Sequence, residues 1–211
     1  MDRTLVYRPG LDLLYLEEVL RLGIDQEEAK HKWYSCHGVP MLVQLLELGV
    51  SQSSAIAFCE EFFERCEGLP AQPIPGAELL LQTARALGLQ VCVTTGSGQK
   101  LAEQTLRQAE LLHLTDLVLG SEPGCLKGPE HMKTIKEYID PVSPRSLRRS
   151  WMVGDGNRDM QLALQHGVGQ RVGLCIPGVG GSNPQELQAH GAQWVAEDLE
   201  EVTKALLKGF S

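Results

Sequence analysis

Two hydrophobic patterns alternate along the chain from residue 75 to its end. Apolar residues at helical spacing follow Pro75-Gly76, and residues 91–95 then form the continuous apolar run of a buried strand. Further short apolar runs cover residues 117–120, 151–153, 171–176 and 193–195. Helical patterns lie between the successive runs as far as 171–176, and a last one covers residues 198–208. Strands that alternate with helices form a parallel sheet with helices on both faces. We therefore predict an α/β fold with a doubly wound, Rossmann-like core.

Residues 11–70 have a different pattern, with helical runs and few β-branched segments. The helical runs cover residues 11–22, 26–36, 41–48 and 51–66. They lie between a short N-terminal segment and the alternating part of the chain, and the second linker is rich in proline. We predict a core of residues 1–9 and 71–211, with a small helical cap of residues 10–70 inserted near its start.

The composition narrows the class of protein. The chain has 211 residues, 43% of them hydrophobic, which is enough for one domain with a small insertion. Because no apolar run approaches the roughly 20 residues that span a bilayer, and the start does not resemble a signal peptide, we expect a cytoplasmic protein without a membrane partner. A net charge of −8 without a basic stripe argues against nucleic-acid binding. The six cysteines form no Cys-x-x-Cys pair, so we expect reduced thiols and neither zinc nor a disulfide framework.

The most informative polar residues follow the apolar run at residues 151–153. Gly154-Asp155 ends this expected strand, and Asp159 follows four residues later. A strand, a tight turn and the first turn of a helix would place both carboxylates at the carboxyl edge of the sheet, where ligands bind in such folds. Paired carboxylates suit Mg²⁺, which keeps its other positions for water and phosphate. The same residues also fit a plain Gly-Asn turn followed by a helix-capping aspartate.

Four segments, in this order, resemble the haloacid dehalogenase superfamily. They are Asp2-Arg-Thr4 near the start, Thr95-Gly96 after an expected strand, Lys127-Gly-Pro in a loop, and the segment from Asp155 to Asp159. The resemblance covers essentially the whole chain. It points to the phosphatases with a helical cap, and most closely to the phosphoglycolate phosphatase-like members.

The resemblance implies Mg²⁺-dependent hydrolysis of a small phosphorylated metabolite through an aspartyl-phosphate. In the family, the residue at Asp2 is a general acid and base, the hydroxyl at Thr95 holds a phosphate oxygen, and the amine at Lys127 neutralises charge. The candidate catalytic residues are Asp2, Thr95 and Lys127, the candidate substrate contacts are Thr4, Gly96 and Arg8, and the candidate metal ligands are Asp2, Asp155 and Asp159.

One residue of the family's first motif falls outside the chain. The motif is Asp-x-Asp-x-Thr after an apolar strand, and its first Asp attacks phosphorus. Aligned on Thr4, Asp2 takes the second place, so the nucleophile would lie directly before Met1. The strand before the motif lies in the middle of the family's sheet, so its loss would expose the edges of its neighbours. The chain is either a fragment of an ordinary enzyme or a short form that cannot make the covalent intermediate; we favour the fragment.

Cap residues are expected to select the substrate. The candidates are Arg8, Arg21, Lys30, His31, Lys32, Trp33, His37 and Arg65, although most such side chains in proteins are solvated surface groups. Trp33 and His37 lie four residues apart on one helical face, so they either face the site together or pack against a neighbouring helix.

Several alternatives stay open. Asp2 favours phosphatases or phosphomutases over the phosphonoacetaldehyde-hydrolysing branch, which Thr94-Thr95-Gly96 nevertheless resembles. The missing nucleophile motivates a different hypothesis, a non-catalytic protein that binds phosphate or a partner on the same scaffold. A response-regulator receiver domain shares the core and the acidic site, but the helical insertion and the late acidic pair disfavour it. We expect a monomer or a homodimer.

Overall fold

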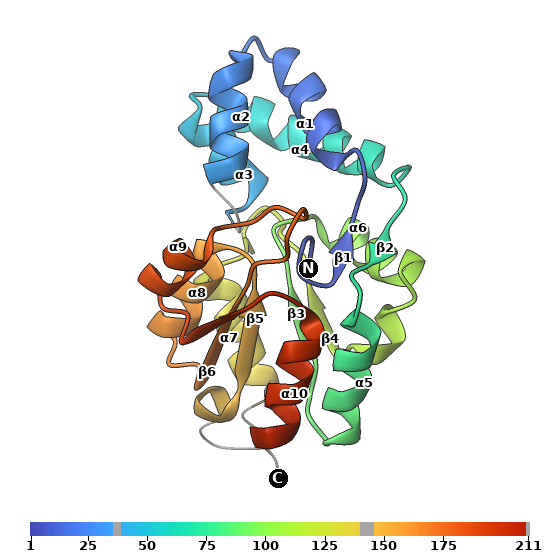
Figure 1. Ribbon diagram of the computed structural model, residues 1–211. Coiled ribbons are helices and arrows are strands. Elements are labelled where there is room, and N and C mark those ends of the chain that lie inside the picture. Colours follow the sequence, from blue (N-terminus) through green and yellow to red (C-terminus); the bar gives the residue numbers. More distant parts are fainter. Residues whose placement is uncertain (36–38, 140–145, 210–211) are drawn as a thin grey trace.

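The computed structural model describes residues 1–35, 39–139 and 146–209. Four helices come early in the chain: α1 (Leu11–Leu20), α2 (Gln26–Ser35), α3 (Met41–Glu47) and α4 (Gln52–Cys66). Helices and strands then alternate in the order α5 (Ala77–Ala86), β3 (Cys92–Thr94), α6 (Gln99–Gln108), β4 (Leu117–Leu119), α7 (Pro129–Ile139), β5 (Trp151–Gly154), α8 (Asn157–Gln165), β6 (Gln170–Leu174), α9 (Pro184–Ala189), β7 (Trp194–Ala196) and α10 (Leu199–Gly209). This order confirms the predicted α/β alternation (Figure 1).

The parallel strands form two separate parts. Strand β3 pairs with β4, and β5, β6 and β7 pair in that order, all in parallel. Among the described residues, no ladder joins β3 to β5. A cavity of about 520 Å³ lies between them, lined by residues of both strands.

Successive side chains of the strands contribute to apolar layers on opposite faces. Val93 and Val172 belong to the layer that includes helices α5, α6 and α10, whereas Cys92 and Met152 pack against residues of α7 and α8. Helices therefore cover both faces of the sheet, as predicted for a doubly wound core (Figure 1).

Helices α1–α4 lie over the carboxyl edge of the strands (Figure 1) and pack around an apolar cluster of their own. Tyr15 stacks on Trp33 with ring centroids 4.1 Å apart, and Phe62 meets Tyr15 edge-on. The two linkers pair as the short antiparallel strands β1 (Val6–Tyr7) and β2 (Gln72–Pro73). We refer to α1–α4 as the cap; the division into a core of residues 1–9 and 71–211 and a cap of residues 10–70 remains a proposal.

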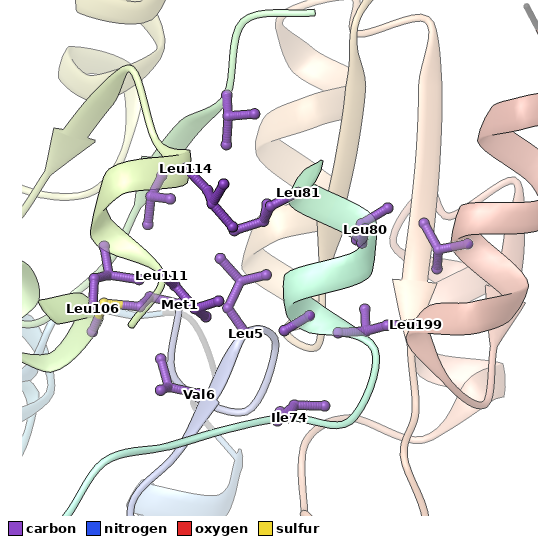
Figure 2. Packing of buried hydrophobic residues seen from close by; sticks show 14 of the residues in the cluster. Met1, Leu5, Val6, Ile74, Leu80, Leu81, Leu106, Leu111, Leu114 and Leu199 are labelled. Atoms are coloured by element: carbon purple, nitrogen blue, oxygen red, sulfur yellow. The ribbon is translucent and has the colours of Figure 1, made fainter. Parts of the chain in front are cut away.

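The N-terminal loop is anchored by apolar packing. The amides of Leu5 and Val6 donate hydrogen bonds to the carbonyl of Met1, at 2.8 and 3.2 Å, so the loop folds back on itself. Figure 2 shows Met1 beside Leu106 and Leu111, with Leu5 and Val6 in the same cluster. This packing fixes the loop that carries the first motif.

Burial controls the reactivity of the cysteine thiols. The described cysteines are free, and burial raises the pKa of Cys59 to about 12 and the pKa of Cys66 and Cys92 to about 11. These thiols are therefore protonated at neutral pH and weakly reactive.

None of the helices in the described part of the chain has the length and apolar character needed to cross a membrane.

Asp116 ties the start of β3 to α5 and gives a pH-dependent prediction. Burial opposes its charge, but a hydrogen bond from the Val91 amide and an ion pair with Arg85, both 2.8 Å, outweigh burial and lower the pKa of Asp116. Its ionised form stabilises the fold above the unfolded-state pKa of about 3.9, and this contribution is lost as the pH falls through the lowered folded-state value. We expect Asp116→Asn to lower the melting temperature at pH 7 by roughly 2–4 °C. The difference from wild type should shrink as the pH is lowered from about 5; a constant difference in thermal unfolding scans would contradict this assignment.

Candidate active site

A pocket of about 120 Å³ lies between the cap and the carboxyl ends of β3 and β5. Thr95 follows β3, Asp155 follows β5, and Lys127 lies in the loop before α7. Asp159, in the first turn of α8, and Asp2, from the N-terminal loop, complete the polar lining. The structure thus brings together side chains that the sequence predicts at one edge of the sheet.

Asp155 and Asp159 form a buried pair of carboxylates. Gly154 permits the close approach of Asp159 to the end of β5, since a Cβ atom at position 154 would lie 2.8 Å from the side chain of Asp159. Burial and the negative charge of Asp159 both raise the pKa of Asp155. Two carboxylates that share a site away from water need a nearby cation to stay ionised.

Lys127 supplies one such cation. Its Nζ lies 2.6 Å from Oδ1 of Asp159, and the side chain is buried. The Lys127 amide donates to Oγ of Ser121 at 2.9 Å, and the Ser121 hydroxyl donates to the carbonyl of Thr95 at 3.0 Å. Ser121 therefore holds two active-site loops together. Sequence reasoning missed this residue, although it follows β4 closely and so lies at the edge where ligands bind.

Thr95 and Thr4 use their hydroxyl groups differently. The Thr95 hydroxyl oxygen accepts a hydrogen bond from the Ser97 amide at 3.2 Å, which leaves its proton available to an incoming anion. The Thr4 hydroxyl donates to Oδ1 of Asp155 at 2.7 Å and so orients that carboxylate. Gly96 packs under the cap, where a Cβ atom would lie 3.3 Å from Cα of Pro40. Direct substrate contacts by Thr4 and Gly96 remain proposals.

Asp2 turns toward Arg8 and Ser97. Its carboxylate accepts hydrogen bonds from Nε of Arg8 at 3.2 Å and from the Ser97 hydroxyl at 3.1 Å. Burial alone would raise the pKa of Asp2. The positive charge of Arg8, then that of the α-amino group, and the hydrogen bond from Ser97 outweigh burial and lower this pKa. Within the ranges that the structure describes, no three His, Cys, Asp or Glu side chains are grouped as a metal site. A metal contact by Asp2 therefore remains a proposal, as does a substrate contact by Arg8.

Arg3 links the N-terminal loop to the cap at the pocket. Its guanidinium pairs with Asp12 on α1 at 2.7 Å and lies 5.7 Å from the centre of the Trp33 ring. Asp12 also accepts a hydrogen bond from the Trp33 indole N–H at 2.8 Å. The backbone of Arg3 has a φ of +59°, a left-handed conformation that is strained for an L side chain. Sequence reasoning assigned no role to Arg3.

The strained backbone of Arg3 leads to a prediction about two substitutions. Arg3→Gly and Arg3→Ala both remove the ion pair with Asp12, but only glycine relieves the strain. We expect the glycine variant to be more stable than the alanine variant by about 1 kcal/mol, the reverse of their order in a helix. Urea unfolding of the two variants measures this difference. An alanine variant as stable as the glycine variant would show that the left-handed conformation is not maintained.

Most candidate specificity residues of the cap have other partners. Arg8 and Trp33 line the pocket. Arg21 and Arg65 instead pair with Glu18, and Lys32 pairs with Glu47. Lys30 approaches Glu27, and His31 is exposed. His37 lies outside the described residues.

The residues present fit a divalent cation. The Lys127 ammonium offsets one of the two negative charges of Asp155 and Asp159, so the buried carboxylate pair has room for further positive charge. Carboxylate oxygens are the hard ligands that Mg²⁺ prefers. With such a cation bound, the pocket would carry net positive charge beside the hydroxyl of Thr95, which suits a phosphate.

The chain is similar to known proteins over most of its length. A family model described as haloacid dehalogenase-like hydrolase matches residues 1–171. The fold is similar to that of a predicted phosphatase from Clostridium acetobutylicum, with a TM-score of 0.77, 19% identity, and coverage of 99% of this chain and 95% of that chain. It is also similar to a HAD family hydrolase from Deinococcus radiodurans with bound phosphate and sodium (TM-score 0.70, 20% identity, 100% and 94% covered). A third similar structure is a predicted phosphoglycolate phosphatase from Haemophilus somnus (0.72, 18%, 98% and 95%). No curated protein sequence matches the chain.

Proposed function

The chain belongs to the haloacid dehalogenase-like hydrolases, and we propose that it is a Mg²⁺-dependent phosphatase for a small organic phosphate. The observation that carries this proposal is the grouping of Thr95, Lys127, Asp155 and Asp159 in one buried pocket. Phosphoryl transfer depends on positioning and charge neutralisation, and these side chains supply both.

In this proposal the chain's own residues bind and orient the phosphate. The Thr95 hydroxyl donates a hydrogen bond to a phosphate oxygen, and the Gly96 amide donates a second hydrogen bond beside it. Lys127 neutralises negative charge on the phosphate and on the attacking group. Mg²⁺ held by Asp155 and Asp159 would supply further neutralisation of the transferring phosphoryl group.

Asp2 is the proposed acid and base. Its lowered pKa keeps it ionised at neutral pH, and Arg8 and Ser97 fix its carboxylate. Ionised Asp2 accepts a proton from the water that cleaves the phosphoenzyme, and the same proton then passes to the next leaving group. When the family's first motif is aligned on Thr4, its attacking carboxylate has no counterpart within residues 1–211. Met1 itself lines the pocket together with Lys127 and Asp155.

The pocket limits the substrate. A volume of about 120 Å³ admits a phosphate with a small organic group, such as phosphoglycolate or a small sugar phosphate, and the fold similarity to a predicted phosphoglycolate phosphatase supports this class. We place the reaction in the cytoplasm and expect a monomer or a homodimer as its unit. Phosphomutase-like and phosphonoacetaldehyde hydrolase-like reactions are less supported, the latter because Asp2 retains an acid.

The test is hydrolysis of p-nitrophenyl phosphate and phosphoglycolate by a form extended upstream with an apolar strand and a terminal Asp. We expect Mg²⁺-dependent turnover by this extended form and none when the added Asp is replaced by Asn. The Asn form is the matched control, since it keeps the strand. Equal rates with Mg²⁺ and with EDTA, or no turnover by the Asp form, would overturn the proposed function.

The second candidate function is a non-catalytic protein that binds phosphate or a partner on the same scaffold. It is favoured by the first motif, which, aligned on Thr4, has no counterpart of the attacking Asp within residues 1–211. Under this alternative, Mg²⁺ and phosphate stabilise the protein against heat, and the extended Asp form still shows no turnover.

A further inference from the structure

A second cavity lies between the cap and the core, next to the active-site pocket. Its volume is about 280 Å³, more than twice the volume of about 120 Å³ of the active-site pocket. Ile56 and Cys59 of α4 line it on the cap side, and Leu101 of α6 and Leu126 of the loop after β4 line it on the core side. Because most of this lining is apolar, we refer to it as the apolar cavity.

One aromatic side chain lies on the boundary between the two cavities. Among the residues that the structure describes, only Phe63 and Gly96 line both the active-site pocket and the apolar cavity. Gly96 contributes backbone alone, so the side chain on this boundary is the ring of Phe63, which belongs to α4. Since the Gly96 amide is a proposed phosphate contact, the boundary lies beside the position proposed for the phosphate.

The ring of Phe63 is held against the core. It lies on Gly98, where a Cβ atom would come within 3.0 Å of its Cδ2 atom and 3.4 Å of its Cε2 atom, so the lack of a side chain at residue 98 gives the ring its place. Two contacts keep α4 next to α6. Nζ of Lys100 lies 2.8 Å from Oε1 of Glu67, and Leu101 packs in the apolar cluster of the cap. While these contacts hold, the ring keeps the two cavities apart.

The apolar cavity suits the organic part of a phosphate ester rather than its phosphate. The charged residues that line it have a net negative charge, which repels a phosphate; they are Glu60, Glu64, Glu67, Glu122 and Lys100. The hydroxyl of Thr95 and the ammonium of Lys127 line the active-site pocket and not the apolar cavity. An ester held there by its phosphate can therefore extend only its organic group toward the apolar cavity, and the ring of Phe63 lies in the way.

We propose that Phe63 determines how large an organic group the active site accepts. With the ring in place, the substrate is confined to about 120 Å³, which selects phosphate esters with a short organic group. Without the ring, the two cavities join, and an apolar group such as an aromatic ring system extends past Gly96 into the apolar cavity. The apolar surface that this group removes from water then adds to the affinity. This inference rests on the proposed function, because it takes the phosphate site as given.

The experiment compares methyl phosphate with 1-naphthyl phosphate, which carries the same charge, by calorimetric titration into the protein with saturating Mg²⁺. We expect the wild-type protein to bind methyl phosphate at least about tenfold more tightly than 1-naphthyl phosphate, because the ring of Phe63 excludes the larger group. Phe63→Ala should bind 1-naphthyl phosphate at least about tenfold more tightly than wild type does, with the affinity for methyl phosphate changed by less than about twofold. An unchanged ratio of the two dissociation constants in Phe63→Ala, or equal binding of both esters by the wild-type protein, would overturn the proposal.

Phe58→Ala is the matched control for a loosened cap. Phe58 also belongs to α4 and packs in the apolar cluster of the cap, but it lines neither cavity. Its replacement should destabilise the cap and leave the selectivity between the two esters unchanged; an equal change of selectivity in both alanine variants would refute the role of Phe63. Phe63→Leu keeps more of the packing and should shift the selectivity in the same direction by about threefold. If Phe63→Ala does not fold, the absence of this shift in Phe63→Leu overturns the proposal.

A double variant tests where the naphthyl group binds. Ile56 lines the apolar cavity and not the active-site pocket, so Ile56→Trp added to Phe63→Ala should fill the cavity and return the selectivity toward that of wild type. A double variant that binds 1-naphthyl phosphate as tightly as Phe63→Ala would place the group elsewhere and contradict the proposal.

The same titrations distinguish this inference from the proposed function. If the wild-type protein does not bind methyl phosphate with Mg²⁺, the phosphate site is absent and both the proposed function and this inference fail. If it binds methyl phosphate and the selectivity does not change in the Phe63 variants, this inference alone fails.

Discussion

Asp155→Asn is expected to raise the melting temperature of the metal-free protein and to abolish its stabilisation by Mg²⁺. In the folded protein, burial and Asp159 raise the pKa of Asp155, so its ionised form is less favourable in the fold than in the unfolded chain. The destabilisation is present at neutral pH and disappears as the pH falls through the raised folded-state pKa toward the unfolded value of about 3.9. Asparagine keeps an acceptor for Thr4 and removes the charge. We expect a rise of roughly 2–4 °C in EDTA at pH 7.

Mg²⁺ should stabilise the wild-type protein more than the Asp155→Asn variant, which is the reverse of their order of stability in EDTA. At about 100 times its Kd, Mg²⁺ stabilises the wild-type protein by about 2.7 kcal/mol, or about 5–10 °C in melting temperature. The Asn variant lacks a ligand and should show little shift. Glu61→Gln removes an exposed carboxylate of α4 and is the matched control, with wild-type behaviour in both conditions. An equal Mg²⁺ shift in the Asp155 variant, measured by thermal scans, would remove this residue from the metal site.

Lys127→Met is expected to destabilise the metal-free protein by about 3 kcal/mol or more. The Lys127 ammonium lies 2.6 Å from Asp159 and both side chains are buried, so its removal leaves the carboxylate pair without this cation. Breaking one half of a buried ion pair typically costs about 3–5 kcal/mol. Urea unfolding in EDTA measures the loss, and Mg²⁺ should stabilise the variant more than wild type because it replaces part of the missing charge.

A second substitution separates charge from packing in this prediction. Lys127→Met combined with Asp159→Asn removes both members of the ion pair, and most of the lost stability should return. If the double variant were as unstable as Lys127→Met alone, the loss would come from packing around the lysine stem. Phosphate binding should be lost in both variants, since the lysine is absent from each.

Most helices and strands were predictable because their hydrophobic pattern extends over enough residues to be recognised. Residues 26–36 and 41–48 were expected as helices and form α2 and α3 within one residue of those bounds at the described positions. Helix α9 was missed because it has six residues, fewer than two turns of periodicity. Its capping box, in which Asn183 and Glu186 bond each other's backbone amides, was a local signal that could have found it. Strands β1 and β2 have two residues each and carry no period.

The sequence was enough to predict at which edge of the sheet the site lies, but not which side chains contact each other there. Parallel strands end at one edge, so Thr95, Lys127 and Asp155 were expected together and do lie in one pocket. Which group pairs with which depends on distances that a sequence does not contain. The Arg3–Asp12 pair joins loop and cap in this way, and no spacing rule indicates it.

The central claim is that Asp155, Asp159, Lys127 and Thr95 form one site for a divalent cation and a phosphate. The most direct test is calorimetric titration of inorganic phosphate into the protein with saturating Mg²⁺ and with EDTA. If both ligands share the site, Mg²⁺ should tighten phosphate binding at least about tenfold, and phosphate should tighten Mg²⁺ binding by the same factor. The coupling should be lost in Asp155→Asn. Phosphate affinities that are equal with and without Mg²⁺ would contradict a shared site.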